Sequence, residues 1–181
     1  MAAGVEPSRI YTDVLSPALR SIGEHWHNGT SSIADEHRAT AIANRIVGRL
    51  SARFTRRGRD RGRIVIGTPA GEGHALPVAM VSDMLRGAGF EVIDLGVDLP
   101  TDAFVEAATA ASPLTAIAVS VTNPAIVDSV ADLSAALKAE LDVPIVVGGY
   151  AVEDEDHARR LGADAYAADG PAAVEFASSL S

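Results

Sequence analysis

The chain contains no cysteine, and this absence excludes disulfide bonds, thiolate metal sites and cysteine nucleophiles. Long apolar runs are also missing: no predominantly apolar stretch reaches membrane-spanning length, so we expect no membrane segment. Residues 1–8 lack the basic region and the apolar run of a signal peptide. Together these absences favour a cytoplasmic protein.

Positive charge is scarce after the first third of the chain. Residues 64–181 contain four lysines and arginines against eighteen acidic residues, whereas residues 1–63 contain eleven arginines against six acids. The net charge of −9 therefore hides a basic segment, whose arginines are Arg53, Arg56, Arg57, Arg59, Arg61 and Arg63. No recognisable DNA-recognition helix accompanies these arginines. They are therefore typical of a solvated basic linker, and we expect no direct DNA binding.

Apolar residues recur at helical spacing in two segments before residue 55. The first segment spans about 8–26, and its apolar positions are Ile10, Val14, Leu15, Leu19 and Ile22. Pro17 is expected to bend or divide this segment. The second segment runs from capping residues at 30–32 to about residue 54, with one face formed by Ile42, Ile46, Leu50 and Phe54. The two segments predict a helical hairpin. The hairpin and the basic linker together make up a predicted N-terminal helical region, the helical cap, which spans residues 1–62.

From residue 63 onward, short apolar runs alternate with segments of helical length. Strands are expected at 64–67, 91–95, 115–121, 145–148 and 163–167, and helices at about 78–88, 101–111, 124–141, 153–161 and 171–180. Each helical connection implies a right-handed crossover between parallel strands. Residues 63–181 therefore predict an α/β, flavodoxin-like domain with a five-stranded parallel sheet of order 2-1-3-4-5. Its ligands are expected beyond the carboxyl ends of the strands.

The loop after the first strand contains a histidine with no evident structural role. His74 follows Glu72 by two residues, and Glu72 can accept a hydrogen bond from one ring nitrogen and so decide which nitrogen faces a metal. A solvated loop histidine is the alternative interpretation. The loops after the third and fourth strands reach the same edge of the sheet with small groups, at Ser120, Val121 and Thr122 and at Gly148, Gly149 and Tyr150. The two glycines also suit a plain tight turn.

These three loops resemble the cobalamin-binding domains of corrinoid proteins, and the resemblance covers essentially the whole chain. The family's signature places an acid, any residue and a histidine after the first strand, matched by Glu72, Gly73 and His74, with serine and double-glycine motifs after the third and fourth strands. The resemblance implies that His74, followed by Ala75 and Leu76, is the lower ligand of cobalt. It also implies that the serine and glycine loops line a slot for the cofactor's nucleotide tail. Pro77 stands where the signature has glycine, and it cannot donate an amide hydrogen bond.

A second resemblance concerns the helical hairpin. In the CarH-type light-sensing cobalamin proteins a tryptophan is followed after nine residues by Glu-His, and Trp26 is followed at that spacing by Glu36 and His37. The resemblance implies that these residues enclose the upper face of adenosylcobalamin. It also implies that His27 binds cobalt from above after light has cleaved the cobalt–carbon bond. In that family a DNA-binding module precedes a four-helix bundle. Here we expect only the final two helices of the bundle and no DNA-binding module before them, so the resemblance does not extend to DNA binding.

The leading hypothesis is therefore a regulatory, light-sensing cobalamin module without enzymatic activity, in which loss of the upper ligand changes assembly or partner binding. It implies cobalamin and its cobalt as cofactor, and a homo-oligomer or a regulatory protein as partner. Two alternatives stay open: a corrinoid methyl carrier that works between two methyltransferases, and a protein that stores or delivers cobalamin.

Overall fold

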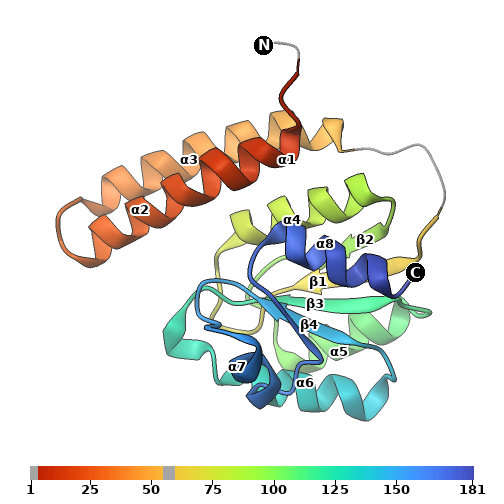
Figure 1. The fold of residues 1–181 in the computed structure, drawn as a ribbon. Coiled ribbons are helices and arrows are strands. Elements are labelled where there is room, and N and C mark those ends of the chain that lie inside the picture. The colour runs from red at the N-terminus through yellow and green to blue at the C-terminus, as the bar shows by residue number, and fades with distance from the viewer. Residues whose placement is uncertain (1–3, 55–59) are drawn as a thin grey trace. The chain divides into compact units, whose positions relative to one another are not determined.

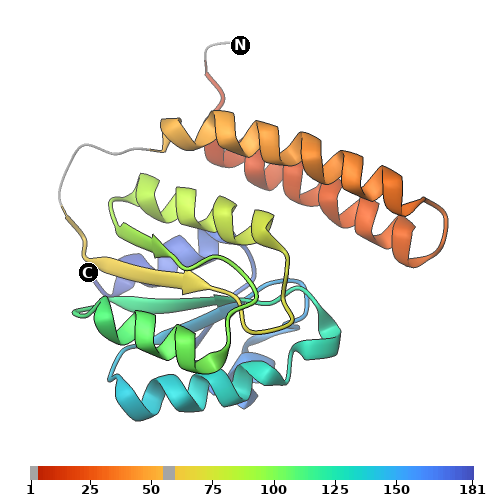
Figure 2. The same cartoon turned by 180° about the vertical axis from the view of Figure 1, so that it is seen from behind.

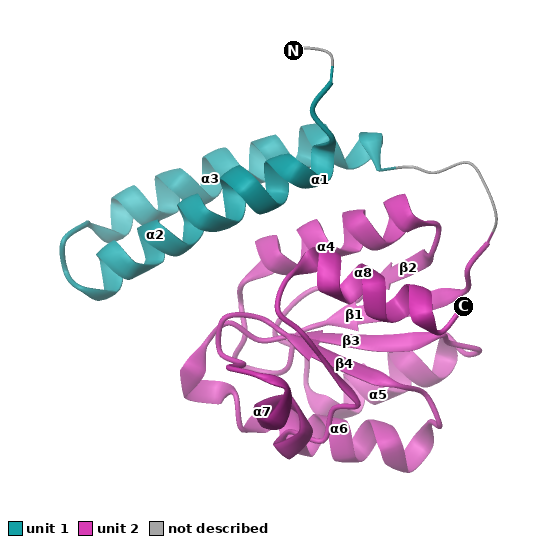
Figure 3. Ribbon diagram, in the orientation of Figure 1, with its two compact units in different colours: residues 1–55 teal, residues 56–181 magenta. Residues whose placement is uncertain are grey.

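The computed structural model describes residues 4–54 and 60–181. These residues fall into two units, one within residues 1–55 and the other within residues 56–181 (Figure 1, Figure 3). Three arginines of the predicted basic linker, Arg56, Arg57 and Arg59, lie outside the described residues. Among the residues described, no helix has both the length and the apolar character needed to cross a membrane.

The first unit is a hairpin of two long helical runs (Figure 1). The first run consists of α1 (Pro7–Ile10), the π-helical turn η1 (Tyr11–Leu15) and α2 (Ser16–His27); the second consists of α3 (Ile33–Leu50) and the 3-10 turn η2 (Ser51–Arg53). The Ser16 amide donates to the Tyr11 carbonyl, the wider hydrogen bond of a π-helix, just before Pro17. Because proline has no amide hydrogen, the helical hydrogen-bond pattern changes where Pro17 predicted an interruption.

The largest buried side chains of the hairpin gather at the end away from its turn. Tyr11 stacks on Phe54 with ring centroids 5.1 Å apart. The other large side chains buried in this unit are those of Leu15, Val47 and Leu50. No residue of α2 is buried, so the half of the hairpin near the turn contributes little to the core.

Two apolar residues of the predicted helical patterns are exposed within this unit. Val14 is 57% exposed and Ile42 is 45% exposed. Leu15, which belongs to the same predicted pattern as Val14, is buried, and so is Ala43, which is next to Ile42. Adjacent apolar residues on a helix lie roughly 100° apart, so periodicity alone could not choose between them.

The second unit is built on a parallel sheet of five strands in the order β2-β1-β3-β4-β5 (Figure 1, Figure 2). The strands are β1 (Arg63–Gly67), β2 (Glu91–Asp94), β3 (Ala116–Ser120), β4 (Ile145–Gly148) and β5 (Ala165–Ala167). Helices α4 (Ala75–Ala88) and α8 (Gly170–Ser179) cover one face, and α5 (Thr101–Ala110), α6 (Ser129–Glu140) and α7 (Glu155–Arg160) cover the other. This arrangement confirms the predicted flavodoxin-like fold.

Element boundaries differ from the predictions at several places. Strand ends shift by one or two residues, and α4 begins at Ala75 rather than at Val78. The segment predicted as one helix over 124–141 is a 3-10 turn, η3 (Pro124–Ile126), followed by α6. Asn123 explains this break, because its Oδ1 accepts the Ala125 amide at 3.0 Å and caps the short turn locally.

Two apolar clusters fill the two faces of the sheet. On one face, Val65, Ile117 and Val147 belong to the same cluster as residues of α5 and α6. On the other face, Ile64 and Ile66 belong to the same cluster as residues of α4 and α8. The central strands are therefore buried on both sides, as in other parallel sheets, and they anchor the loops at their ends firmly.

Candidate functional site

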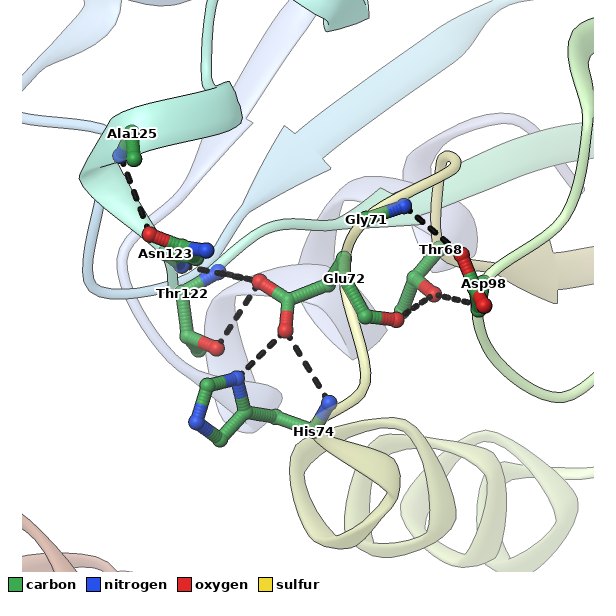
Figure 4. Close-up of polar contacts among 8 residues, drawn as sticks. All are labelled: Thr68, Gly71, Glu72, His74, Asp98, Thr122, Asn123 and Ala125. Carbon is green, nitrogen blue, oxygen red and sulfur yellow. Dashed lines mark hydrogen bonds and ion pairs between the residues drawn. The ribbon is translucent and has the colours of Figure 1, made fainter.

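The candidate site lies where β1 and β3 end, at the carboxyl edge of the sheet (Figure 4). β1 and β3 are hydrogen-bonded neighbours, with Gly67 paired to Val119 near their ends. The loops that follow these two strands therefore leave the sheet side by side. This topology brings Glu72 into contact with Thr122, which is 50 positions later in the chain. Ligand sites of open α/β sheets occur at this edge.

The carboxylate of Glu72 is the centre of the site. Its Oε2 accepts the amide N–H of Thr122 at 2.6 Å, the amide N–H of Asn123 at 2.8 Å and the Thr122 hydroxyl at 3.0 Å. Its Oε1 accepts the amide N–H of His74 at 3.0 Å and contacts Nδ1 of the His74 ring. Glu72 is 1% exposed. A buried carboxylate requires hydrogen bonds in place of water, and here both loops supply them.

The same contacts keep Glu72 ionised. Burial alone would raise the pKa of Glu72, because burial disfavours the charged form. The hydrogen bonds from the His74 ring and from the amides of Thr122, His74 and Asn123 outweigh burial and lower the pKa from 4.5 to about 2. Glu72 is therefore a pure hydrogen-bond acceptor at neutral pH.

His74 lies at the N-cap position of α4 with its ring oriented by Glu72. Since the carboxylate can only accept, Nδ1 carries the hydrogen in their contact, and in the neutral ring Nε2 then carries the lone pair. Nε2 points away from Glu72 (Figure 4), and the His74 side chain is 63% exposed. A carboxylate that fixes the tautomer of a histidine in this way is typical of metal-binding histidines.

Pro77, which replaces the signature's glycine, lies in the first turn of α4. The first four amide groups of a helix have no carbonyl acceptor within the helix. The missing N–H of Pro77 therefore costs no helical hydrogen bond, and its fixed φ suits this turn. The departure from the family signature is compatible with a regular helix directly after His74.

The small residues at the ends of β3 and β4 pack closely against neighbouring backbone. Ser120 and Gly148 are paired across the two strands. A Cβ atom on Gly148 would lie 2.4 Å from the Ala167 carbonyl oxygen, and one on Gly149 would lie 2.2 Å from the Val121 carbonyl oxygen. Gly149 also has a φ of +114°, which other residues rarely adopt. The sheet itself therefore requires these glycines, as the tight-turn alternative proposed, and their contact with a cofactor stays a prediction.

The other predicted residues of the second unit divide into buried and exposed groups. Val121 and Leu76 are buried, so their side chains shape the loops from within. Gly73, Ala75 and Tyr150 are exposed. Tyr150 follows directly after the Gly148–Gly149 turn, which places it at the same edge of the sheet as the loops of His74 and Thr122.

The predicted residues of the first unit lie at the turn of the hairpin. Trp26 and His27 end α2, while Glu36 and His37 lie in the opening turns of α3. Trp26 is 49% exposed. Glu36 Oε1 accepts the Thr40 hydroxyl at 2.7 Å, and His37 Nε2 lies 3.6 Å from Glu36 Oε2. Both contacts are local, and the upper-face role of these residues stays a prediction.

Three residues that hold the site together were absent from the sequence-based candidates: Thr68, Asp98 and Asn123. Asn123 donates its backbone amide to Glu72. Every residue except proline has such an amide, so the residue type could not reveal this contact. Thr68 and Asp98 contact the backbone of Gly71 and Glu72. The position of Thr68 next to the end of β1 was the one available signal for it.

The carboxyl edge of the sheet thus carries a buried carboxylate, a histidine with a fixed tautomer and closely packed loops of small residues. These features are typical of an α/β protein that binds a ligand or cofactor at this edge. Comparison with known families specifies the cofactor. Residues 62–177 match a B12 binding domain family, and residues 1–51 match a second B12 binding domain family. The chain belongs to the B12-binding family, and cobalamin with its cobalt ion is its cofactor.

Individual relatives are corrinoid proteins of methanogens. The chain is 31% identical over 180 residues to the dimethylamine corrinoid protein of Methanosarcina barkeri, covering 97% of this chain and 84% of that protein. The structure of the Methanosarcina barkeri monomethylamine corrinoid protein matches with a TM-score of 0.88 and 23% identity, over 99% of this chain and 86% of that one. The methanol:cobalamin methyltransferase complex MtaBC from Methanosarcina barkeri matches with a TM-score of 0.61 and 19% identity, over 98% of this chain and 69% of that one.

These findings confirm the cobalamin-binding resemblance in its broad form. The narrower resemblance to CarH-type light sensors is not supported by them. The names of the relatives match the methyl-carrier alternative better than the light-sensing hypothesis.

Proposed function

We propose that the chain is a corrinoid methyl-carrier protein that binds cobalamin through His74 and presents it to a methyltransferase. The observation that carries the proposal is the network around Glu72, which directs Nε2 of His74 out of the loop. The corrinoid relatives named for methylamines, and the similarity to a methyltransferase complex, support the methyl-carrying role. A methyltransferase is accordingly the proposed partner, and the chain itself has no catalytic side chain in this proposal.

The donor chemistry at the site fits cobalamin. A bound corrinoid supplies a cobalt ion that accepts a methyl group from one protein and passes it to another. His74 contributes one imidazole nitrogen, which is a suitable ligand for a borderline metal ion such as cobalt. Glu72 holds the His74 ring in one orientation through Nδ1, so little rotational freedom is lost when Nε2 binds.

The first test compares two histidines of the same unit. His157 serves as the control, because it lies in α7 and its Nδ1 accepts the Glu153 amide at 3.3 Å, a contact local to that segment. His74→Ala is expected to weaken methylcobalamin binding by at least about tenfold and to remove the histidine-ligated visible spectrum, while His157→Ala leaves both unchanged. Titration of the purified protein with methylcobalamin, followed by its visible spectrum, measures both. Equal binding by wild type and His74→Ala would overturn the role of His74.

A second test separates the carrier from the light sensor. The methylcobalamin-loaded protein is mixed with a methylamine-specific methyltransferase and an excess of an amine as methyl acceptor. The methyl group is expected to pass to the amine and leave reduced cobalt on the carrier, which the visible spectrum reports. In parallel, the adenosylcobalamin-loaded protein is run on a size-exclusion column in the dark and after green light, and no change of size is expected. A light-dependent size change without methyl exchange would reverse the conclusion in favour of the light-sensing hypothesis, with His27 as the first residue to substitute.

A further inference from the structure

The backbone of Glu72 is fixed as tightly as its carboxylate. The Thr68 hydroxyl donates to the Glu72 carbonyl at 2.8 Å and accepts the Asp98 amide N–H at 2.9 Å. The Asp98 amide also lies 2.9 Å from the Glu72 carbonyl. Thr68 is fully buried, so its hydroxyl is used as both donor and acceptor inside the protein. The loops after β1 and β2 are therefore joined at the residue that orients His74.

Asp98 completes this connection from the loop after β2. Its Oδ1 accepts the Gly71 amide N–H at 2.7 Å (Figure 4). Asp98 is the one non-glycine among the described residues with a positive φ, at 58°. This conformation is sparsely populated for residues other than Asn, Asp and Gly, and it persists here because the surrounding bonds require it.

The loop needs such a restraint because of its composition. Glycines flank Glu72 on both sides, at Gly71 and Gly73, and glycine loses more conformational freedom on ordering than any other residue. A carboxylate carried by such a loop would sample many positions. The hydrogen bonds to Gly71 and to the Glu72 carbonyl remove this freedom before the cofactor arrives.

We propose that Thr68 and Asp98 are positioning residues for the cobalt ligand, acting on His74 through Glu72. We call the pair the Thr68–Asp98 clasp. Through it the loop after β2, which contributes nothing to the Glu72 carboxylate, determines how firmly that carboxylate holds the His74 ring. The inference rests on the proposed function, since His74 must ligate cobalt for the clasp to matter to binding.

Two matched pairs of variants test the clasp. Thr68→Val keeps the shape and removes the hydroxyl, whereas Thr68→Ser keeps the hydroxyl. Asp98→Gly tolerates the positive φ and removes the acceptor, whereas Asp98→Asn keeps both the acceptor and a residue suited to this φ. Thr68→Val and Asp98→Gly are expected to bind methylcobalamin about tenfold more weakly and to show a smaller histidine-ligated fraction in the visible spectrum. The Ser and Asn variants are expected to restore both readouts.

The same variants are examined without cofactor by amide hydrogen exchange. Protection of the Gly71 amide is expected to fall in Asp98→Gly and to persist in Asp98→Asn. Thr109→Val, the same change at an exposed threonine of α5, controls for the substitution itself. If wild type binds cobalamin through His74 but Thr68→Val and Asp98→Gly keep its affinity and spectrum, the clasp has no positioning role. Failure of the wild type to bind through His74 would instead contradict the proposed function.

Discussion

The carboxyl edge of the sheet and the turn of the hairpin both carry a glutamate and a histidine, yet they hold them in different ways. At the sheet edge, Glu72 is buried and receives hydrogen bonds from two loops that are 50 positions apart. At the hairpin turn, Glu36 is bonded to Thr40 four residues later, and His37 is exposed. The first arrangement exists only in the folded domain, whereas the second needs no more than a helix.

This difference indicates how much each region can be displaced without unfolding. The side chains at the hairpin turn are restrained by local contacts, so a bound partner or cofactor can reposition them at low cost. The Glu72–His74 pair cannot move without breaking hydrogen bonds that connect the loop after β1 to the loop after β3. A firmly held His74 suits the cobalt-ligand role proposed for it above.

The largest difference between the two regions is expected when the glutamate of each is replaced by glutamine. Glu72→Gln places an amide NH₂ against backbone donors and is expected to lower the free energy of unfolding by about 2–4 kcal/mol. Glu36→Gln keeps an oxygen for the Thr40 hydroxyl and is expected to change it by less than about 0.5 kcal/mol. Urea unfolding followed by far-UV circular dichroism measures both. Similar losses in the two variants would show that the two glutamates are held alike.

Acid titration sharpens the comparison further. The pKa of Glu72 is lowered to about 2 in the folded protein from its ordinary 4.5, so its contribution is complete above the ordinary pKa and is lost as the pH falls toward 2. At about 1.4 kcal/mol for each pKa unit, the loss is on the order of 3 kcal/mol. Wild type is therefore expected to lose stability more steeply than Glu72→Gln between about pH 5 and pH 2. Parallel pH profiles would contradict the assignment.

Some acid dependence is expected to persist in the Glu72→Gln variant. Asp164 also has a lowered pKa: burial would raise it, but hydrogen bonds from Lys138 and from the Ile145 amide outweigh burial. The difference between the two profiles, rather than either slope, isolates Glu72. Because both proteins carry Asp164, its contribution cancels in that difference.

A smaller loss than that of Glu72→Gln is expected from the cap of α3 at the hairpin turn. Ser32 Oγ accepts the Asp35 amide at 3.2 Å in a capping box, and Ser32→Ala is expected to destabilise the hairpin by about 1 kcal/mol. Ser31 is the control, because its buried Oγ has no hydrogen-bond partner among the described residues, and Ser31→Ala is expected to be nearly neutral. Fluorescence of Trp26, the only tryptophan, reports on this unit during unfolding. A larger loss from Ser31→Ala than from Ser32→Ala would refute the capping interpretation.

Sequence reasoning located the parts of the site that depend on short spacings or on strand ends. Glu72 and His74 are two residues apart, and Thr122 was found because parallel strands end at one edge. Thr68 and Asp98 were missed, because they act on backbone atoms of the loop from different strands. Periodicity alone did not show which apolar residues of the hairpin would be buried: Val14 and Ile42 are exposed, whereas Leu15 and Ala43 beside them are buried.

The sequence by itself determined the order of strands and helices, the cap of α3 and the pairing of Glu72 with His74, because each depends on residues close together in the chain. Only the tertiary structure decided that Glu72 would be a buried carboxylate with donors from the loop after β3 and a backbone held from the loop after β2. The physical reason is that hydrogen bonds to backbone atoms depend on where strands end in space. Side-chain identity carries almost no information about that.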